Sequence, residues 1–203
     1  EQVVLKKLKY FKKKYKVNNL AISGGVGLNC SLNGKIEKSK IFKKIFVQPA
    51  SGDSGTAIGA VYSAFEKKYK NKIKIQKRNN SYLGKNYSSR EIEVLLKKKK
   101  IKYRKPKKIY DEVANYIDAG KIIACFQKGA EFGPRALGNR SILCKPYPKK
   151  MKDYLNLRVK FRENFRPFAP AVLEEELSNW FDIELPSPYM LFVAPVKHEL
   201  CQK

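Results

Sequence analysis

Short apolar runs that stop at glycine-containing turns alternate along this chain with longer segments of helical periodicity. Residues 20–22 (LAI) and 121–127 (KIIACFQ) are typical of short strands, the second one buried, and each is followed by a turn with glycines. Residues 3–15 instead place apolar side chains at helical spacing, with lysines on the other face. This alternation of strands and helices predicts an α/β or α+β fold.

The remaining elements follow the same two patterns. They are a strand at 43–50 stopped by Pro49, a loop at 51–55 leading into a helix, a helix capped by Ser88 or Ser89, a strand at 100–105 (KIKYRK), and a helix at 109–119 ended by Gly120. Residues 67–80 lose apolar periodicity and gain charge, so we predict a linker there. The predicted domains are therefore residues 1–66 and 81–203.

The composition bounds the class of protein. The 203 residues are 43% hydrophobic and 12% aromatic, which is enough for a packed core. No apolar run approaches the roughly 18 residues of a membrane span, and lysines interrupt every apolar group near the start, which is unlike a signal peptide. We therefore expect a cytoplasmic protein. The scattered cysteines are expected to be reduced and buried, and the single His198 cannot complete a multi-histidine metal site within the chain.

The net charge of +26, from 44 Lys+Arg against 18 Asp+Glu, raises the question of a nucleic-acid partner. The lysines are spread along the chain and lack the aromatic pattern of an RNA-reading sheet. Solvated helix faces are the favoured interpretation, so nucleic acid is an unlikely partner. An attraction to phosphorylated ligands follows under either interpretation.

Two glycine-rich turns follow predicted strands. In SGGVGLN (23–29) the glycines let the backbone approach a phosphate closely, although turn geometry alone explains them equally well. In ASGDSGTAIGA (50–60), Asp53 could cap a helix, bind a metal or orient a phosphate. Taken in isolation, Asp53 favours capping.

A third motif, EFGPRALGNRS (131–141), combines two turns with two arginines. Gly133-Pro134 and Gly138 predict the turns, and the guanidinium groups of Arg135 and Arg140 suit carboxylate or phosphate oxygens. The alternative is an arginine buried against Glu131 as a structural pair. The backbone donors of the adjoining turns favour a ligand-binding role for Arg135.

A fourth motif, VKFRENFRPFAPAV (159–172), alternates cations with phenylalanines. Phe161, Phe165 and Phe168 are too apolar for a solvated charge run. We expect the cations to project from an apolar wall into a pocket, where low polarity strengthens their attraction for an anion. Together the third and fourth motifs predict one small, strongly anionic ligand.

In this order, the four motifs resemble the carbamoyltransferases of the nodulation-protein and antibiotic O-carbamoylation type. The similarity runs from about residue 18 to residue 196. It implies the tail of an actin/Hsp70-like ATPase fold followed by an incomplete YrdC-like α/β domain. It also implies that carbamoyl phosphate and ATP form carbamoyl-adenylate, whose carbamoyl group passes to a hydroxyl of a small acceptor. ATP, which normally comes with Mg, and an iron-type divalent metal are the implied cofactors.

The resemblance implies roles for individual residues. It assigns catalysis to Arg135, Lys160 and Arg166, and metal ligation to Asp53. The residues it implies for substrate or nucleotide binding are Gly24, Gly25, Asn29, Glu131, Gly133, Arg135, Asn139, Arg140, Lys160, Arg162 and Arg166.

The chain departs from the family pattern in three places. Upstream histidines of the metal site and a downstream segment of the adenylation pocket do not occur in it, and Lys128 stands where the family order of residues is disturbed. We therefore expect the isolated chain not to complete carbamoyl transfer, and expect a homodimer or a partner that supplies the missing N-terminal region. A tRNA-modifying or RNA-binding relative and a non-catalytic split-gene remnant stay open as alternatives.

Overall fold

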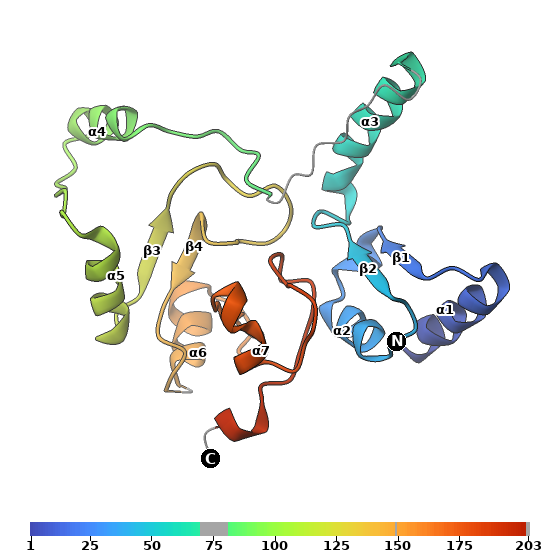
Figure 1. Ribbon diagram of the computed structural model, residues 1–203. Coiled ribbons are helices and arrows are strands. Elements are labelled where there is room, and N and C mark those ends of the chain that lie inside the picture. Colours follow the sequence, from blue (N-terminus) through green and yellow to red (C-terminus); the bar gives the residue numbers. More distant parts are fainter. Residues whose placement is uncertain (70–80, 149, 202–203) are drawn as a thin grey trace. The chain divides into compact units, whose positions relative to one another are not determined.

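The computed structural model describes residues 1–69, 81–148 and 150–201, which combine helices and short strands in an α+β arrangement (Figure 1). Two compact units are present, and each is assembled from separate stretches of chain. Unit 1 comprises Glu1–Ser81, Phe132–Arg135 and Val172–Lys203, and unit 2 comprises Tyr82–Glu131 and Ala136–Ala171. The predicted linker lies mostly outside the described residues, and the predicted domain boundaries stay a prediction.

Unit 1 is organised around two parallel strands. β1 (Asn19–Ile22) pairs with β2 (Lys44–Val47), with Asn19 opposite Lys44 and Ile22 opposite Val47. Parallel strands need a crossover connection, and here the chain passes through the 3₁₀ turn η1 (Gly25–Leu28) and the helix α2 (Cys30–Lys38). Both predicted strands are confirmed, whereas α2 was not predicted.

The other elements of unit 1 flank this pair. They are α1 (Gln2–Tyr15), η2 (Asp53–Gly55), α3 (Thr56–Tyr69), η4 (Glu174–Glu176), α7 (Leu177–Trp180) and η5 (His198–Leu200). The predicted helices α1 and α3 are confirmed. The apolar face of α3 is not covered by the described residues, since Val61 is 66% exposed and Phe65 46% exposed.

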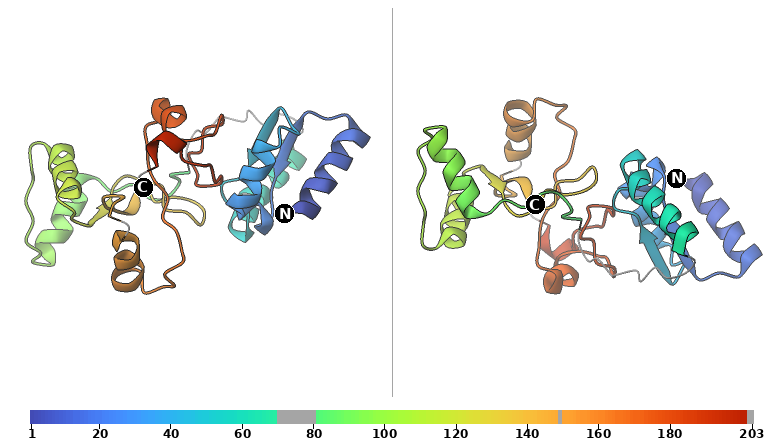
Figure 2. Two further views of the ribbon diagram at one scale, coloured as in Figure 1. Left: turned by 90° about the horizontal axis from the view of Figure 1, so that it is seen from below. Right: turned by 90° about the horizontal axis from the view of Figure 1, so that it is seen from above.

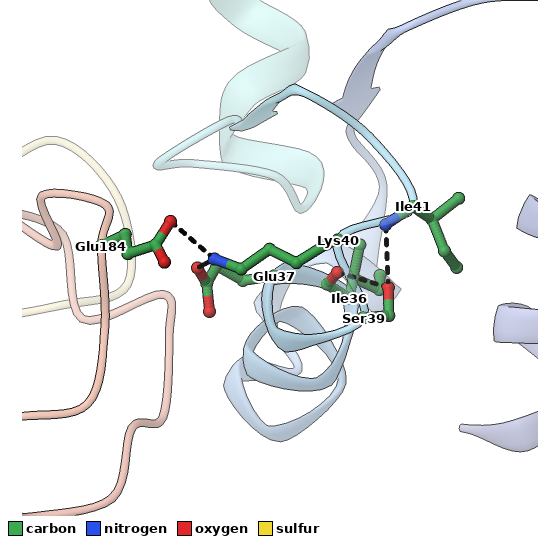
Figure 3. Close-up of polar contacts among 6 residues, drawn as sticks. All are labelled: Ile36, Glu37, Ser39, Lys40, Ile41 and Glu184. Carbon is green, nitrogen blue, oxygen red and sulfur yellow. Dashed lines mark hydrogen bonds and ion pairs between the residues drawn. The ribbon is translucent and has the colours of Figure 1, made fainter.

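The core of unit 1 joins α2 to segments far away in the sequence. Its buried hydrophobic residues are Leu32, Ile36, Ile41, Phe42, Val47, Ala50, Ile183 and Leu191. At the end of α2, the Nζ of Lys40 lies 2.8 Å from carboxylate oxygens of both Glu37 and Glu184 (Figure 3). The segment around residues 183–191 is thus held against α2 by apolar burial and by an ion pair.

Unit 2 contains an antiparallel pair with two helices before it. These helices are α4 (Ser89–Lys98) and α5 (Ile109–Asp118), and Figure 2 shows both on the same side of the strands. β3 (Ile123–Phe126) pairs with β4 (Arg140–Leu143). The chain continues into α6 (Lys150–Tyr154) and the π-helical turn η3 (Leu155–Val159).

The start of α4 is a capping box whose N-cap is Ser88, one of the two serines that the sequence predicted as the cap. The hydroxyl of Ser88 accepts from the Glu91 amide at 3.2 Å, and the Glu91 carboxylate accepts from the Ser88 amide at 2.8 Å. Two of the otherwise unpaired donors at the helix start are thereby satisfied.

Two predictions for unit 2 need correction. The strand predicted at 100–105 is wrong, because Tyr103, Arg104 and Lys105 instead direct their side chains to acidic groups of α4 and α5. β3 is a strand, but it is not buried throughout. Its side chains alternate in exposure and Phe126 is 60% exposed, since the two described strands leave one face of the sheet uncovered.

Across the three described stretches of chain, no helix combines the length and apolar character needed to cross a membrane. All four cysteines are unpaired. Cys30, Cys125 and Cys144 are half-buried, and burial raises the pKa of the Cys144 thiol. None of the four is fully buried and Cys201 is exposed, so the prediction of buried cysteines is wrong.

Candidate anion site

Parts of three motifs meet within unit 1. The guanidinium of Arg135, from the third motif, donates from Nη2 to the carbonyl of Leu28 in the first motif at 3.4 Å. Gly133 packs against the second motif, because a Cβ built on it would lie 3.4 Å from the Cβ of Ala50. Residues separated by more than eighty positions in the sequence therefore share one region of unit 1.

The first motif forms a tight turn after β1. Gly24 adopts a φ of +90°, which favours glycine, and the 3₁₀ turn η1 follows it. Gly24 and Gly25 are exposed and nothing crowds their α-carbons, so their backbone is accessible. Asn29 has a structural role: its Oδ1 accepts from the Leu32 amide at 3.0 Å and caps α2.

Arg135 has one incomplete set of hydrogen bonds. Its Nε is buried and makes no hydrogen bond to any described residue, while its Nη2 makes the long bond to the Leu28 carbonyl. A buried donor without a partner costs about 1–3 kcal/mol. Since a guanidinium is always charged and presents its donors as a planar fork, the accessible part of this half-buried side chain is suited to an anion.

Glu131 organises the loop of the third motif. Its Oε1 accepts from the amides of Leu137 at 2.7 Å, Asn139 at 2.9 Å and Arg140 at 3.2 Å. Burial raises the pKa of the Glu131 carboxyl, but the backbone donors outweigh it and hold that pKa below its usual value. The carboxylate is thus engaged in shaping the loop, and no described arginine side chain pairs with it.

Asn139 and Arg140 close the same loop. The Nδ2 of the buried Asn139 donates to the Gly129 carbonyl at 2.8 Å. Arg140 donates to three backbone carbonyls, those of Gln127, Lys128 and Asn139, and its guanidinium carbon lies 3.5 Å from the ring centroid of Phe126. Most of the guanidinium donors are therefore used within the loop.

The predicted turns of the loop are present. Gly133 and Gly138 adopt φ values of +114° and +104°, and the Gly138 amide donates to the Ser141 hydroxyl at 2.9 Å. The loop is consequently preorganised by its own hydrogen bonds.

The fourth motif borders a pocket in unit 2. The pocket has a volume of about 670 Å³ and is lined by Leu157, Phe161, Arg162, Glu163 and Arg166. Phe161 is 82% exposed and its φ of +48° is unusual for a bulky residue. Two arginines and an exposed aromatic ring thus lie beside one another at this pocket, and the binding of an anion there stays a prediction.

A residue missed by sequence reasoning holds this loop. Asn156 is completely buried, and its Nδ2 donates to the carbonyls of Asn164 at 3.3 Å and Arg166 at 2.9 Å. Its Oδ1 accepts from the Nε of Arg162 at 2.7 Å. Arg162 also lies over the Phe168 ring, with 4.7 Å to the centroid. No feature of the sequence pattern distinguished Asn156 from other polar residues in a helical turn.

The other two predicted cations of the fourth motif, Arg166 and Lys160, differ in whether a described residue pairs with them. The Nε of Arg166 lies 2.8 Å from the carboxylate of Glu163. Lys160 is exposed, and its ammonium makes no hydrogen bond or ion pair within the described stretches. The structure thus groups Arg135 with the glycine turn in unit 1, and Lys160, Arg162 and Arg166 with the pocket in unit 2.

Asp53 begins η2 and is exposed. Its backbone carbonyl accepts from the Thr56 hydroxyl at 2.6 Å, but its side chain makes no capping bond. Nowhere in residues 1–69, 81–148 and 150–201 do three His, Cys, Asp or Glu side chains gather as a metal site would require. The described residues alone therefore do not fit the implied metal.

Comparisons with known proteins give consistent results along the chain. A family model described as the carbamoyltransferase N-terminus matches residues 1–62, and one described as the carbamoyltransferase C-terminus matches residues 114–203. An uncharacterized protein of Synechocystis sp. is 41% identical over 98% of this chain and 34% of its own length.

Two named relatives are similar over most of the chain. Nodulation protein NolNO of Sinorhizobium fredii is 38% identical over 97% of this chain and 30% of its own length. Nodulation protein U of Rhizobium tropici is 37% identical over 86% of this chain and 28% of its own length. The chain thus spans about a third of the length of the curated relatives it matches.

Proposed function

Because this chain belongs to the carbamoyltransferase family, we propose that it carries the carbamoyl-phosphate and nucleotide sites of an ATP-dependent O-carbamoyltransferase. The observation that supports this proposal most strongly is the state of Arg135. Its buried Nε has no hydrogen-bond partner among the described residues, and its fork lies beside the Leu28 carbonyl of an accessible glycine turn. An anionic phosphate in contact with the accessible part of this half-buried guanidinium would be held by its fixed charge and its planar donors.

The proposed reaction has two steps, formation of carbamoyl-adenylate and transfer of its carbamoyl group to the acceptor. Carbamoyl phosphate, water and ATP give carbamoyl-adenylate, phosphate and pyrophosphate, with the carbamate oxygen displacing pyrophosphate from the α-phosphorus. The acceptor hydroxyl then attacks the carbamoyl carbon, the bond to the AMP oxygen breaks, and the hydroxyl proton is released. The mixed anhydride is the better donor because AMP is a good leaving group.

In this proposal, Arg135 binds the phosphate of carbamoyl phosphate. The accessible backbone of Gly24 and Gly25 contacts the nucleotide in unit 1, as amides of a tight turn can donate to phosphate oxygens. Glu131 and Arg140 shape the loop, since their polar atoms are already engaged with backbone groups.

The pocket of the fourth motif takes the developing negative charge of adenylate formation. Arg162 and Arg166 line it beside the exposed ring of Phe161, and the free ammonium of Lys160 follows the same turn. Cations held beside an apolar surface stabilise phosphate charge more strongly than cations in open solvent. Arg162 is fixed by Asn156, so its contribution needs little reordering.

The proposal includes the two implied metals but assigns them few protein ligands. Magnesium would accompany ATP and neutralise charge on its phosphates. Asp53 is the one described residue proposed as a ligand of the iron-type metal, and no step is assigned through that metal. The acceptor is proposed to be a small hydroxylated metabolite, and a homodimer or a partner chain is proposed to supply further residues.

The test is carbamoyl-phosphate-dependent pyrophosphate release from ATP. We expect the protein to release pyrophosphate only when carbamoyl phosphate is also present, and expect Arg135→Ala to abolish this carbamoyl-phosphate-dependent release. The matched control is Arg90→Ala, because Arg90 is exposed on α4 and its side chain forms no hydrogen bond or ion pair with the described residues. Pyrophosphate release that is independent of carbamoyl phosphate would contradict the proposal.

A further inference from the structure

One buried amide joins two distant parts of unit 1. Asn33 on α2 is 0% exposed, and its Nδ2 donates to the carbonyl of Gly27 at 2.8 Å and to that of Leu191 at 2.9 Å. Gly27 belongs to the glycine turn of the candidate site, whereas Leu191 lies 158 positions from Asn33 in the sequence. The same amide therefore holds the turn and a C-terminal segment at once.

The segment from residue 184 to residue 193 runs along α2 and contacts it at three levels. At the end of α2, Glu184 pairs with Lys40 (Figure 3). Near its middle, Leu191 accepts from Asn33, and near its start the Val193 amide donates to the Cys30 carbonyl at 3.2 Å. We call residues 184–193 the docked segment.

Gly34 makes this docking possible. A Cβ built on Gly34 would lie 2.2 Å from the backbone carbonyl oxygen of Val193, so any side chain there would force the segment away. A glycine inside a helix costs roughly 1 kcal/mol relative to alanine. Its presence on α2 is explained by the close approach of the docked segment.

The two neighbouring backbone carbonyls fix which side-chain atom of Asn33 is the donor. Both Nδ2 hydrogens donate to carbonyls, while Oδ1 is buried and makes no hydrogen bond to any described residue. Only the donors of this side chain thus have partners. A carboxylate of the same shape could not replace them, because it has no donor when ionised.

The glycine turn held by Asn33 is also the turn that accepts from Arg135. Gly27 precedes Leu28 directly, and the Leu28 carbonyl accepts from the Arg135 guanidinium. A displacement of Gly27 therefore moves the acceptor that orients Arg135. This continuity connects the docked segment to the candidate anion site through one side chain.

We propose that Asn33 is a positioning residue that couples the docked segment to the glycine turn, so that the turn binds nucleotide phosphates only while Leu191–Val193 is docked on α2. The nucleotide part of this inference rests on the proposed function. The coupling between the turn and the docked segment stands on the geometry of Asn33 and Gly34.

Two variants distinguish the loss of the Asn33 hydrogen bonds from the displacement of the docked segment. Asn33→Asp keeps the side-chain shape and removes both donations when the carboxyl is ionised, and one of them when it is protonated. Gly34→Ala leaves Asn33 intact and displaces the Val193 carbonyl. The matched control is Gly59→Ala, since a Cβ on Gly59 in α3 meets nothing within 4 Å.

Two readouts are measured for each variant. Hydrogen exchange follows the Val193 amide, which donates to Cys30, and the Gly27 and Asn29 amides, which donate to Gly24 and Val26. Calorimetry with Mg·ATP measures nucleotide affinity. We expect Asn33→Asp and Gly34→Ala to speed exchange of all three amides and to weaken Mg·ATP binding at least tenfold, while Gly59→Ala changes neither.

Faster exchange at Val193 with unchanged exchange at Gly27 and Asn29 in Gly34→Ala would overturn the inference. If Gly34→Ala does not fold, exchange of the unaltered chain in increasing urea decides, because coupled amides must open with the same urea dependence. Separate openings would overturn the coupling. Coupled exchange in a chain that binds no Mg·ATP would support the coupling and overturn the proposed function alone.

Discussion

Replacing Glu131 with glutamine tests whether the third motif is shaped by one carboxylate. The substitution keeps an acceptor oxygen but removes the charge that strengthens bonds to three amides, at 2.7, 2.9 and 3.2 Å. Hydrogen bonds to charged groups contribute about 1.5–3 kcal/mol and neutral ones about 0.5–1.5 kcal/mol. Burial opposes the charged form and offsets part of this difference. We therefore expect Glu131→Gln to lower the free energy of unfolding by about 1–2 kcal/mol at pH 7.

The pH dependence of this difference follows from the direction of the pKa shift. The folded-state pKa of Glu131 is lowered, so its contribution is fully present above the unfolded value of about 4.3. The contribution is lost as the pH falls through the lower folded-state pKa. The stability difference between the unaltered protein and Glu131→Gln should therefore shrink as the pH falls below about 4.3.

Urea unfolding of both proteins over this pH range is the assay. Glu175→Gln is the control, since Glu175 is exposed and forms no hydrogen bond or ion pair within the described part of the chain. A Glu131→Gln variant as stable as the control at pH 7, or a difference that grows in acid, would refute the reasoning.

Two further predictions concern α4 and its surroundings. Ser88→Ala should cost about 1 kcal/mol in urea unfolding, because the capping box is lost, whereas Ser89→Ala, one residue inside the helix, should cost less. Bonds from Lys105, Tyr103 and Lys97 hold the pKa of Glu93 at about 2. An NMR titration should find this low midpoint at low salt and a rise toward the usual value at high salt, and a salt-independent midpoint would contradict the ion-pair explanation.

The sequence predicted those elements whose information is local. The strands around Leu20 and Phe46 and the Ser88 cap were found because alternation, glycine turns and capping residues act over a few positions. α2 was missed, since it carries Gly34 and few apolar residues, and its helical state depends on burial of Leu32 and Ile36 against the core.

Long-range contacts explain the remaining differences. The return of the docked segment to α2 joins residues more than 140 positions apart, and no local pattern encodes it. The third motif contains two arginines, and their side chains have different surroundings. Arg140 is engaged by three carbonyls and Arg135 keeps a buried Nε without a described partner. The composition of the motif predicted an anion site. The structure is needed to distinguish Arg140, which shapes the loop, from Arg135, which is the candidate ligand-binding residue.

The central claim is that the guanidinium of Arg135, which donates from Nη2 to the Leu28 carbonyl, binds the phosphate of carbamoyl phosphate. Calorimetric titration of carbamoyl phosphate into the protein, Arg135→Ala and Arg90→Ala tests it most directly. We predict binding by the protein and by Arg90→Ala, and a loss of at least tenfold in affinity for Arg135→Ala. Equal affinities of all three proteins for carbamoyl phosphate, or no binding by any of them, would contradict the claim.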